Sequence, residues 1–289
     1  MLPTDRPRGR ARLARLVAVI ALGLAVSACG SGLPGPAPSS APLTAQPSAP
    51  APSASPVPAA QTLSPSPPAE PLAGKVIGID PGHNGGNFAD PGAINKQIWN
   101  GREWESCDTT GTDTVSGYTE ALFNFNVARY LRADLRRDGA RVVMTRTTNN
   151  GVGPCVDRRA QIINQAGANV AIDIHADGGP PAGRGFTVLE PVADGPNDSV
   201  VASSQQFGRD VRQAFLAGTA MPVSTYEGVN GIMPRNDLAG LNLTRVPKVL
   251  IECGNMRNGT DASLLVSGRF QRQVAGVLTA AIIRFLGQA

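Results

Sequence analysis

The chain contains two histidines, His83 and His175, and each lies directly behind or at the end of a short apolar run. In GKVIGIDPGHNGG, His83 follows a tight Pro81-Gly82 turn, and in NVAIDIH, His175 closes the run itself. A single histidine in such a place is more often a hydrogen-bonded structural residue than a ligand. Because both histidines occupy the same kind of position, we favour a metal site. Neutral imidazoles and one carboxylate are typical ligands of a catalytic zinc ion, which keeps its fourth position open for water.

Two glutamates are candidates for the remaining chemistry. Glu120 begins the helical pattern of YTEALFNFNVARYL, where the first turn would direct its carboxylate over the strand ends. Its alternative role is electrostatic, since acidic residues stabilise the first turn of a helix. Glu252 ends the apolar run KVLIE. Burying a carboxylate there costs folding free energy, so we expect it either to pair with a cation or to have a function. Glu252 is therefore either a functional group or a member of a structural ion pair.

Apolar runs alternate with helical patterns from residue 74 to the C-terminus. The runs are short and β-branched, as in buried strands, and comprise residues 75–80, 141–146, 169–176, 185–191 and 248–253. Apolar residues at helical spacing predict helices over residues 120–137, 157–166, 198–216 and 261–286. This alternation predicts a single α/β domain with a twisted, mainly parallel central β-sheet flanked by helices. Ligands of such sheets bind beyond the carboxyl ends of the strands, where both histidines are expected.

Residues 1–28 have the features of an export signal. Several arginines precede LVAVIALGLAV, an apolar run that is too short to span a bilayer comfortably. The segment ends in VSAC, which resembles the lipobox of bacterial lipoproteins, in which the cysteine, here Cys29, is acylated after cleavage. An ordinary signal peptidase would cut the same bond and leave Cys29 unmodified. In both cases we expect an exported protein of the periplasm or cell wall, and acylation would anchor it to the outer face of the cytoplasmic membrane.

The next segment, residues 29–73, consists almost entirely of Pro, Ala, Ser and Gly. Such a composition buries too little apolar surface to offset the entropy of ordering, so we expect a disordered tether before a folded domain at residues 74–289. The net charge of +4 comes from the leader, because removing five of the 26 basic residues and one of the 22 acidic residues leaves 21 of each. With an electroneutral remainder and no basic patch, the sequence does not predict a nucleic-acid partner.

The ordered set of motifs from residue 74 onwards resembles one enzyme family. VIGIDPGHNGG, the helix-opening Glu120, VVMTRTT, RRAQIINQAGANVAIDIHADG and VPKVLIECGNMRN are similar, in this order, to the zinc-dependent N-acetylmuramoyl-L-alanine amidases of the Amidase_3 type, which are peptidoglycan autolysins. The resemblance implies that His83, Glu120 and His175 bind one zinc ion. It also implies that Glu252 is the catalytic glutamate of the family's Glu-X-Gly motif.

Several positions depart from the pattern of this family. Asp173 and Asp177 replace the serine and asparagine that usually flank the second histidine, and Cys253 follows the catalytic glutamate where threonine or valine is usual. Asn169 matches the family's alanine-asparagine pair. We expect the departures at Asp173, Asp177 and Cys253 to affect how the substrate fits rather than whether the metal binds.

The activity implied by the resemblance is hydrolysis of the amide between muramic acid and L-alanine, with peptidoglycan or a muropeptide as substrate. Zinc would lower the pKa of water towards about 7, and Glu252 would act as the general base. GIMPRNDLAGLNL resembles the family's substrate-groove loop, which makes Arg235 and Asn236 candidate substrate contacts. Four arginines could meet substrate carboxylates, although most are expected at the solvated surface: Arg158, Arg159, Arg235 and Arg257. We expect a monomer without a separate wall-binding domain.

Two other classes of function remain open from the sequence. A non-catalytic relative could bind peptidoglycan or regulate a hydrolase, although Glu252 and all three ligands are present. A zinc peptidase of similar fold could cut within the stem peptide; the chain has no HExxH motif, which excludes only one group of such enzymes.

A long loop-like segment, residues 87–119, is rich in Gly, Thr and Asn and carries both tryptophans. Loops of this length are usually functional, so we predict a partly ordered hairpin bordering the zinc cleft, with an inert surface insertion as the alternative. Cys107 lies in this segment and Cys155 in another loop. If Cys29 is acylated and Cys253 belongs to the core, Cys107 and Cys155 are the expected disulfide pair.

Overall fold

A computed structural model describes residues 70–288 of the chain. The expected export signal, Cys29 and nearly all of the expected tether lie outside these residues. Leu72, which the sequence places at the end of the tether, is fully buried in the main core, and its backbone N–H donates to the Asp138 carbonyl oxygen at 2.9 Å. Apolar burial therefore extends the folded domain to the N-terminal side of its predicted start at Gly74.

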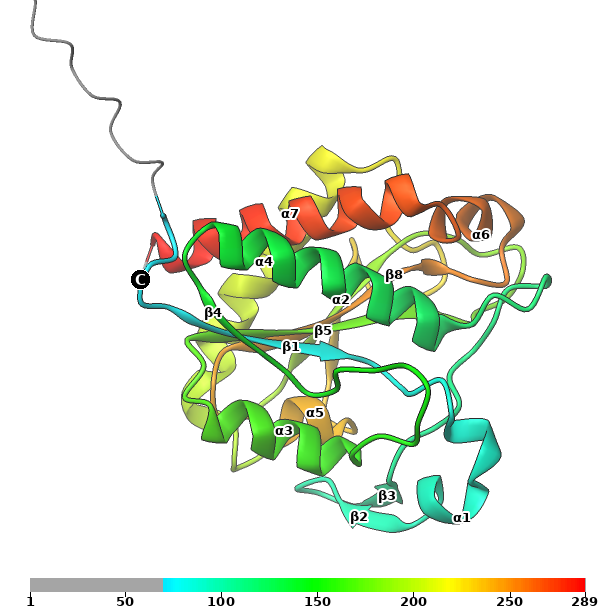
Figure 1. The fold of residues 1–289 in the computed structure, drawn as a ribbon, viewed down its shortest axis with the longest axis horizontal. Coiled ribbons are helices and arrows are strands. Elements are labelled where there is room, and N and C mark those ends of the chain that lie inside the picture. Colours follow the sequence, from blue (N-terminus) through cyan, green and yellow to red (C-terminus); the bar gives the residue numbers. More distant parts are fainter. Residues whose placement is uncertain (1–69, 289) are drawn as a thin grey trace, which may run out of the picture. The chain divides into compact units, whose positions relative to one another are not determined.

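In residues 70–288, six strands form the central sheet in the order β4-β1-β5-β8-β6-β7 (Figure 1). Their bounds are β1 Val76–Pro81, β4 Arg141–Met144, β5 Val170–Asp177, β6 Thr187–Pro191, β7 Ile232–Arg235 and β8 Lys248–Asn255. All neighbouring strands are parallel except β6 and β8, which pair antiparallel. The prediction of an α/β domain with a mainly parallel sheet is confirmed. The edge strand β7 was not predicted, because IMPR is short and contains a proline.

Helices cover both faces of this sheet (Figure 1). The helices that pack on the main core are α2 Glu120–Arg137, α4 Val201–Gly218 and α7 Gly268–Leu286, and the other face carries α3 Val156–Gln165 and α5 Ala239–Asn242. Helix α2 has the predicted bounds because Thr119 caps its N-terminus by accepting from the Leu122 N–H, and the chain turns at Asp138-Gly139. The remaining short helical elements are η1 Asn87–Ala89, α1 Pro91–Ile94, η2 Asp198–Val200 and α6 Gly259–Leu265.

The single helix predicted over residues 261–286 is two helices, α6 and α7, separated at Val266 and Ser267. Ser267 has an extended backbone, with φ −78° and ψ 119°, and Gly268 follows it. Serine favours the N-cap position and glycine weakens a helix interior, so the pair starts a new helix although the apolar periodicity continues.

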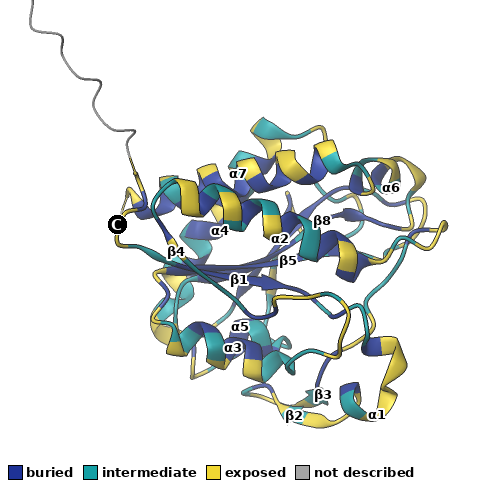
Figure 2. Cartoon of the chain, in the orientation of Figure 1, coloured by how far each residue is buried: buried dark blue, intermediate teal, exposed yellow. Residues whose placement is uncertain are grey.

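Residues alternate between two faces along each central strand. Ile77, Ile79, Ile172 and Ile251 belong to the main core, together with Phe207 of α4, and are fully buried. Strands β1 and β5 are accordingly buried over most of their length (Figure 2). The intervening positions carry polar or ionisable groups towards the opposite face: Asp80 on β1, Asp173 and His175 on β5, and Lys248 and Glu252 on β8. One face of the sheet thus packs in the apolar core, and the other presents the polar and ionisable side chains.

The long segment before α2 contains the predicted hairpin. Strands β2, Gln97–Trp99, and β3, Trp104–Ser106, pair antiparallel, with Trp99 opposite Trp104. Glu105 of this hairpin accepts from the Ala239 N–H of α5 at 3.2 Å, which ties the hairpin to the helices below the sheet. No helix among residues 70–288 is both long and apolar enough to cross a bilayer.

Candidate metal centre

His83 lies in the loop after β1 and has a left-handed backbone conformation with φ 56°. This conformation is uncommon for a residue other than glycine and costs about 1–3 kcal/mol, so other contacts must hold it. Arg159 donates to the His83 carbonyl oxygen at 2.9 Å, and Arg146 donates to the Gly82 carbonyl oxygen at 3.2 Å. A Cβ on Gly82 would lie 2.1 Å from the His175 ring, so only glycine lets the two histidines approach each other.

The three predicted ligands meet at the carboxyl end of the sheet. Oε1 of Glu120 lies 3.3 Å from His83 Nε2 and 2.8 Å from His175 Nδ1. One nitrogen or oxygen atom from each residue lies within 4.8 Å of the others. The two imidazole rings are 4.9 Å apart and nearly perpendicular, at 86°. A Cβ on Gly111, which has φ 69°, would lie 2.7 Å from Glu120 Oε2, so this glycine gives the carboxylate its space.

Electrostatics couple these ligands strongly. Burial alone would lower the pKa of His83, but the charge of Glu120 and the hydrogen bonds that the ring donates to Asp108 and Glu120 raise it to about 9. Burial likewise opposes the charged form of His175, whose pKa is raised well above its usual value by Asp173 and Glu120. Burial would raise the pKa of Glu120, and the two histidines hold it well below the usual range. Glu120 is therefore held in its ionised form, and its carboxylate favours a positive charge beside it, which can be a proton on each histidine or a bound cation.

This donor set fits a zinc ion. Two imidazole nitrogens and one carboxylate oxygen are the ligands that catalytic zinc prefers, and here they converge from β1, α2 and β5. Each histidine also contacts a carboxylate through its other ring nitrogen: Asp108 lies 3.0 Å from His83 Nδ1, and Asp173 lies 3.2 Å from His175 Nε2. Such outer carboxylates orient histidine ligands in metalloproteins.

Glu252 lies beside the triad on the neighbouring strand, where it is the register partner of His175. Its Oε2 atom is buried and has no hydrogen-bond partner among the described residues. Burial raises the pKa of Glu252 well above its usual value; the charge of His175 opposes this rise, and Glu120, Asp177 and Glu227 add to it. An unpaired buried carboxyl group is costly, and no ion pair of the described residues includes Glu252. The structure therefore offers no structural salt bridge to explain this residue.

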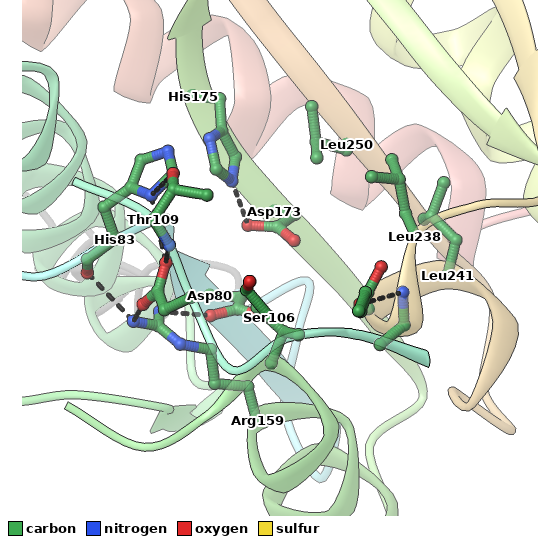
Figure 3. Close-up of a pocket in the computed structure, with 16 residues that line it drawn as sticks. Asp80, His83, Ser106, Thr109, Arg159, Asp173, His175, Leu238, Leu241 and Leu250 are labelled. Atoms are coloured by element: carbon green, nitrogen blue, oxygen red, sulfur yellow. Dashed lines mark hydrogen bonds and ion pairs between the residues drawn. The ribbon is translucent and has the colours of Figure 1, made fainter. Parts of the chain in front are cut away.

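A cavity of about 390 Å³ opens beside the two histidines, on the polar face of the sheet (Figure 3). His83 and His175 form one wall, and Leu238, Leu241 and Leu250 form an apolar wall opposite them. Glu105 and Ser106 of the hairpin also line this cavity, so the hairpin borders it as predicted.

A buried charge network below the cavity was not anticipated. Asp80 accepts from Arg159 at 3.0 Å and from Lys248 at 2.9 Å, and Lys248 also lies 3.4 Å from Asp173. Burial would raise the pKa of Asp80, but the two cations lower it far below the usual range. Arg159 is only 2% exposed, so it is an exception to the expectation that most of the four arginines lie at the solvated surface. The one sequence signal for this network was the lysine that opens the apolar run KVLIE.

The remaining predicted site residues lie at the rim. Arg235 ends β7 and pairs with Asp237 through two contacts, at 2.7 and 2.6 Å. The Asn236 carbonyl oxygen accepts from Asn242 Nδ2 at 2.8 Å. Neither residue lines the cavity, whose wall begins at Leu238.

The structure joins Cys107 to Cys155 by a disulfide. Among the described residues Cys253 is the one free cysteine, and it is buried. Asp177, one of the departures noted in the sequence, accepts from the Tyr226 hydroxyl at 2.6 Å, and Asn169 bridges β5 to the Val76 N–H at 2.8 Å.

Comparison with known proteins agrees with this geometry. A family model described as N-acetylmuramoyl-L-alanine amidase matches residues 77–284, which include all three predicted ligands and Glu252. The chain belongs to this amidase family. An N-acetylmuramoyl-L-alanine amidase of Mycobacterium tuberculosis, Rv3717, is 40% identical over 228 residues, which cover 75% of this chain and 90% of that protein.

Solved structures of amidases share the fold. The crystal structure of the N-acetylmuramyl-L-alanine amidase Ami1 from Mycobacterium smegmatis matches with a TM-score of 0.71 and 40% identity, over 75% of this chain and 99% of that one. The apo form of Ami1 from Mycobacterium abscessus gives a TM-score of 0.70 at 38% identity, over 74% and 100% of the two chains. The amidase AmiC2 of Nostoc punctiforme, at 20% identity and a TM-score of 0.56 over 75% of this chain and 99% of that one, shows the fold alone.

Proposed function

We propose that this protein is a zinc-dependent N-acetylmuramoyl-L-alanine amidase, which hydrolyses the amide between muramic acid and the L-alanine of peptidoglycan stem peptides. One observation carries the proposal: His83, Glu120 and His175 converge within 4.8 Å, and Glu252 lies beside His175 with an unpartnered carboxyl oxygen. Membership of the amidase family supports the choice of bond.

In this proposal His83, Glu120 and His175 hold the zinc ion. When bound, zinc would supply Lewis acidity, which lowers the pKa of water and polarises a carbonyl group. Glu252 would take the proton from the attacking water at a carboxylate oxygen and return it to the leaving amine nitrogen. This role needs an ionised Glu252, whereas burial and the neighbouring carboxylates raise its pKa. A divalent cation at the triad would oppose that rise.

The cavity beside the histidines would hold the groups next to the scissile amide. Its apolar wall of Leu238, Leu241 and Leu250 suits the methyl groups of the lactyl and alanyl units, and burying them excludes water from the polar face. Arg235, the last residue of β7, and Asn236 come shortly before Leu238 in the sequence, and we propose them as contacts to the more distant stem peptide. Part of the Arg235 charge is neutralised by Asp237, which limits its strength as a carboxylate receptor.

We further propose that the protein works as a monomer in the cell envelope, outside the cytoplasm. The apolar leader of residues 1–28 and the VSAC motif support export, with acylation of Cys29 as the proposed anchor. The segment from residue 29 to the start of the folded domain would serve as the tether, and the amidase domain would extend to residue 289. Metabolic labelling with a fatty-acid analogue tests the anchor, and Cys29→Ser should abolish the label.

Mass spectrometry of a muropeptide digest tests the proposed reaction. An amidase releases free stem peptides and leaves intact glycan. Shortened stem peptides that remain attached to muramic acid would show a peptidase instead, and unchanged muropeptides would show a binding protein. The digest is run with zinc, with a chelator, and with zinc restored after the chelator, and we expect free stem peptides only in the first and third samples.

A further inference from the structure

Asp108 contacts the metal-ligand residue His83 on the side that faces away from the triad. The Nε2 atom of His83 faces Glu120, and its Nδ1 atom lies 3.0 Å from Asp108 Oδ1. An ionised carboxylate accepts the Nδ1 proton, which leaves the Nε2 lone pair for a metal. Thr109 Oγ1 also lies 3.2 Å from Nδ1, but a hydroxyl can donate as well as accept and does not fix the tautomer.

The carboxylate of Asp108 is itself held in place. Asp108 is 6% exposed, and its Oδ1 accepts from the Thr109 N–H at 2.7 Å. Its Oδ2 accepts from Arg159 Nη2 at 3.2 Å, and the same nitrogen donates to the His83 carbonyl oxygen at 2.9 Å. Arg159 thus hydrogen-bonds both to the strained backbone of His83 and to the carboxylate that orients the His83 ring.

The disulfide joins the two segments that carry these groups. Cys107 directly precedes Asp108, and Cys155 is the N-cap residue of α3, one turn before Arg159. Beside the disulfide, the Val156 N–H donates to the Cys107 carbonyl oxygen at 2.9 Å. The Cys107–Cys155 bond therefore fixes the distance between Asp108 and the helix that bears its guanidinium partner.

The second histidine is held differently. Asp173, which faces His175 Nε2, lies on the same strand two residues earlier, and Lys248 of the adjacent strand β8 contacts it at 3.4 Å. Sheet hydrogen bonds already fix this pair. Asp108 lies in a loop, 25 residues from His83, and no strand hydrogen bonds fix its position. A disulfide beside Asp108 therefore restricts its position relative to His83, whereas the position of Asp173 relative to His175 is already set by the sheet.

We propose that Asp108 is a positioning residue for His83, and that the Cys107–Cys155 disulfide raises metal affinity by holding Asp108 in place. The inference rests on the proposed zinc site, and it assigns to the disulfide a role beyond general stability. Loss of an outer carboxylate typically lowers metal affinity by about 10- to 100-fold.

Zinc affinity of the full mature chain, measured by competition with a chromophoric chelator, tests the first part. We expect Asp108→Asn to lower the affinity about 10- to 100-fold. Asp210→Asn is the matched control, because Asp210 is equally buried and pairs with Arg284 away from the histidines. The visible spectrum of the Co²⁺-substituted protein should change for Asp108→Asn and not for Asp210→Asn. Equal zinc affinity and equal spectra for wild type and Asp108→Asn would overturn the proposal.

A mutant cycle tests the second part. The double variant Cys107→Ser/Cys155→Ser should lower zinc affinity in the wild-type background and have little further effect in the Asp108→Asn background. If the losses of zinc affinity caused by the cysteine substitutions and by Asp108→Asn simply add, the disulfide does not act through Asp108 and this part of the proposal is overturned. A folded wild-type protein that binds no zinc would refute the proposed function itself, whereas a wild type that binds zinc and an unaffected Asp108→Asn variant refute only this inference.

Discussion

The two faces of the central sheet are formed by alternating residues of the same strands, but one face is apolar and the other carries polar and ionisable side chains. Ile79, Ile172 and Ile251 pack under α2, α4 and α7 in the main core. Their neighbours Asp80, Asp173 and Glu252 point to the face that holds the cavity and the histidines. The apolar face stabilises the fold, and the polar face places charged groups at the carboxyl end of the sheet. The same strand register thus places the apolar core residues and the charged groups. A shift of a strand by one residue would move its side chains to the opposite faces.

The largest expected effect lies on the polar face. Glu252→Gln keeps the size of the side chain but cannot accept a proton, so turnover should fall by about 10² to 10⁴-fold. Zinc content should stay close to one ion per chain, because Glu252 is not part of the triad. Steady-state kinetics on a muropeptide, with elemental analysis of the same sample, check both values. Loss of zinc together with turnover would make Glu252 a ligand and remove the proposed division of roles.

On the apolar face the expected effect is on stability. Phe207 is fully buried and packs on Phe285 at 5.1 Å between ring centroids. Phe207→Ala should lower the free energy of unfolding by about 3–5 kcal/mol, through lost burial and the cavity that remains. Urea unfolding measures this loss. Zinc affinity of the folded fraction should not change, and a clear drop would show that the two faces are not independent.

The disulfide ranks next. Its two cysteines are 48 residues apart, and the chain-entropy model gives a stabilisation of about 4 kcal/mol for such a loop. Cys107→Ser/Cys155→Ser should therefore lower the free energy of unfolding in urea, measured with a chelator present so that zinc does not contribute. Cys253→Ala removes a buried thiol but no cross-link and serves as the control. An equal loss for the control would remove the entropic explanation.

The smallest effect is the pH dependence of the metal-free protein. The pKa of His83 is raised to about 9 in the folded state from its ordinary value of 6.5, so its contribution is complete below pH 6.5 and is lost as the pH rises through about 9. The raised pKa values of His175 and Glu252 act in the same direction. The shift of His83 alone corresponds to a loss of about 3 kcal/mol.

The zinc-loaded protein should respond in the opposite way. Zinc binds deprotonated ligands, so its contribution to stability grows as the pH rises over the same range. Thermal unfolding between pH 6 and pH 9, with and without a chelator, separates the two cases. Parallel pH profiles for the two samples would contradict the assignment of His83 as a ligand.

Much of the fold could be predicted from the sequence, because local chemistry determines it. The bounds of α2 follow from the Thr119 cap and the Asp138-Gly139 turn, and the positions of His83 and His175 follow from the ends of β1 and β5. The two histidines were identified as candidate ligands by the same reasoning, since carboxyl ends of parallel strands meet at one edge. The ligand role of Glu120 was implied by the resemblance to the amidase family.

The parts that the sequence did not reveal depend on contacts between distant residues. Asp80 and Lys248 are 168 residues apart, and Arg159 and Asp108 are 51 residues apart. Nothing in the local sequence around Asp108 shows that its carboxylate reaches a histidine ring. An arginine such as Arg159 is ordinarily expected at the solvated surface, although it shares a helix face with the buried Ile163. Apart from the lysine that opens the run KVLIE, such a buried network becomes visible only when the strands and loops are placed side by side.

The most direct test of the account is the zinc content of the purified protein, measured by elemental analysis for the wild type and for Glu120→Gln. If the triad is a metal centre, the wild type carries one zinc ion per chain, and Glu120→Gln, which removes the carboxylate between the two histidines, loses most of it. If Glu120 only stabilised the start of α2, both proteins would carry the same amount. A folded wild type without zinc, or a variant with undiminished zinc, would contradict the account.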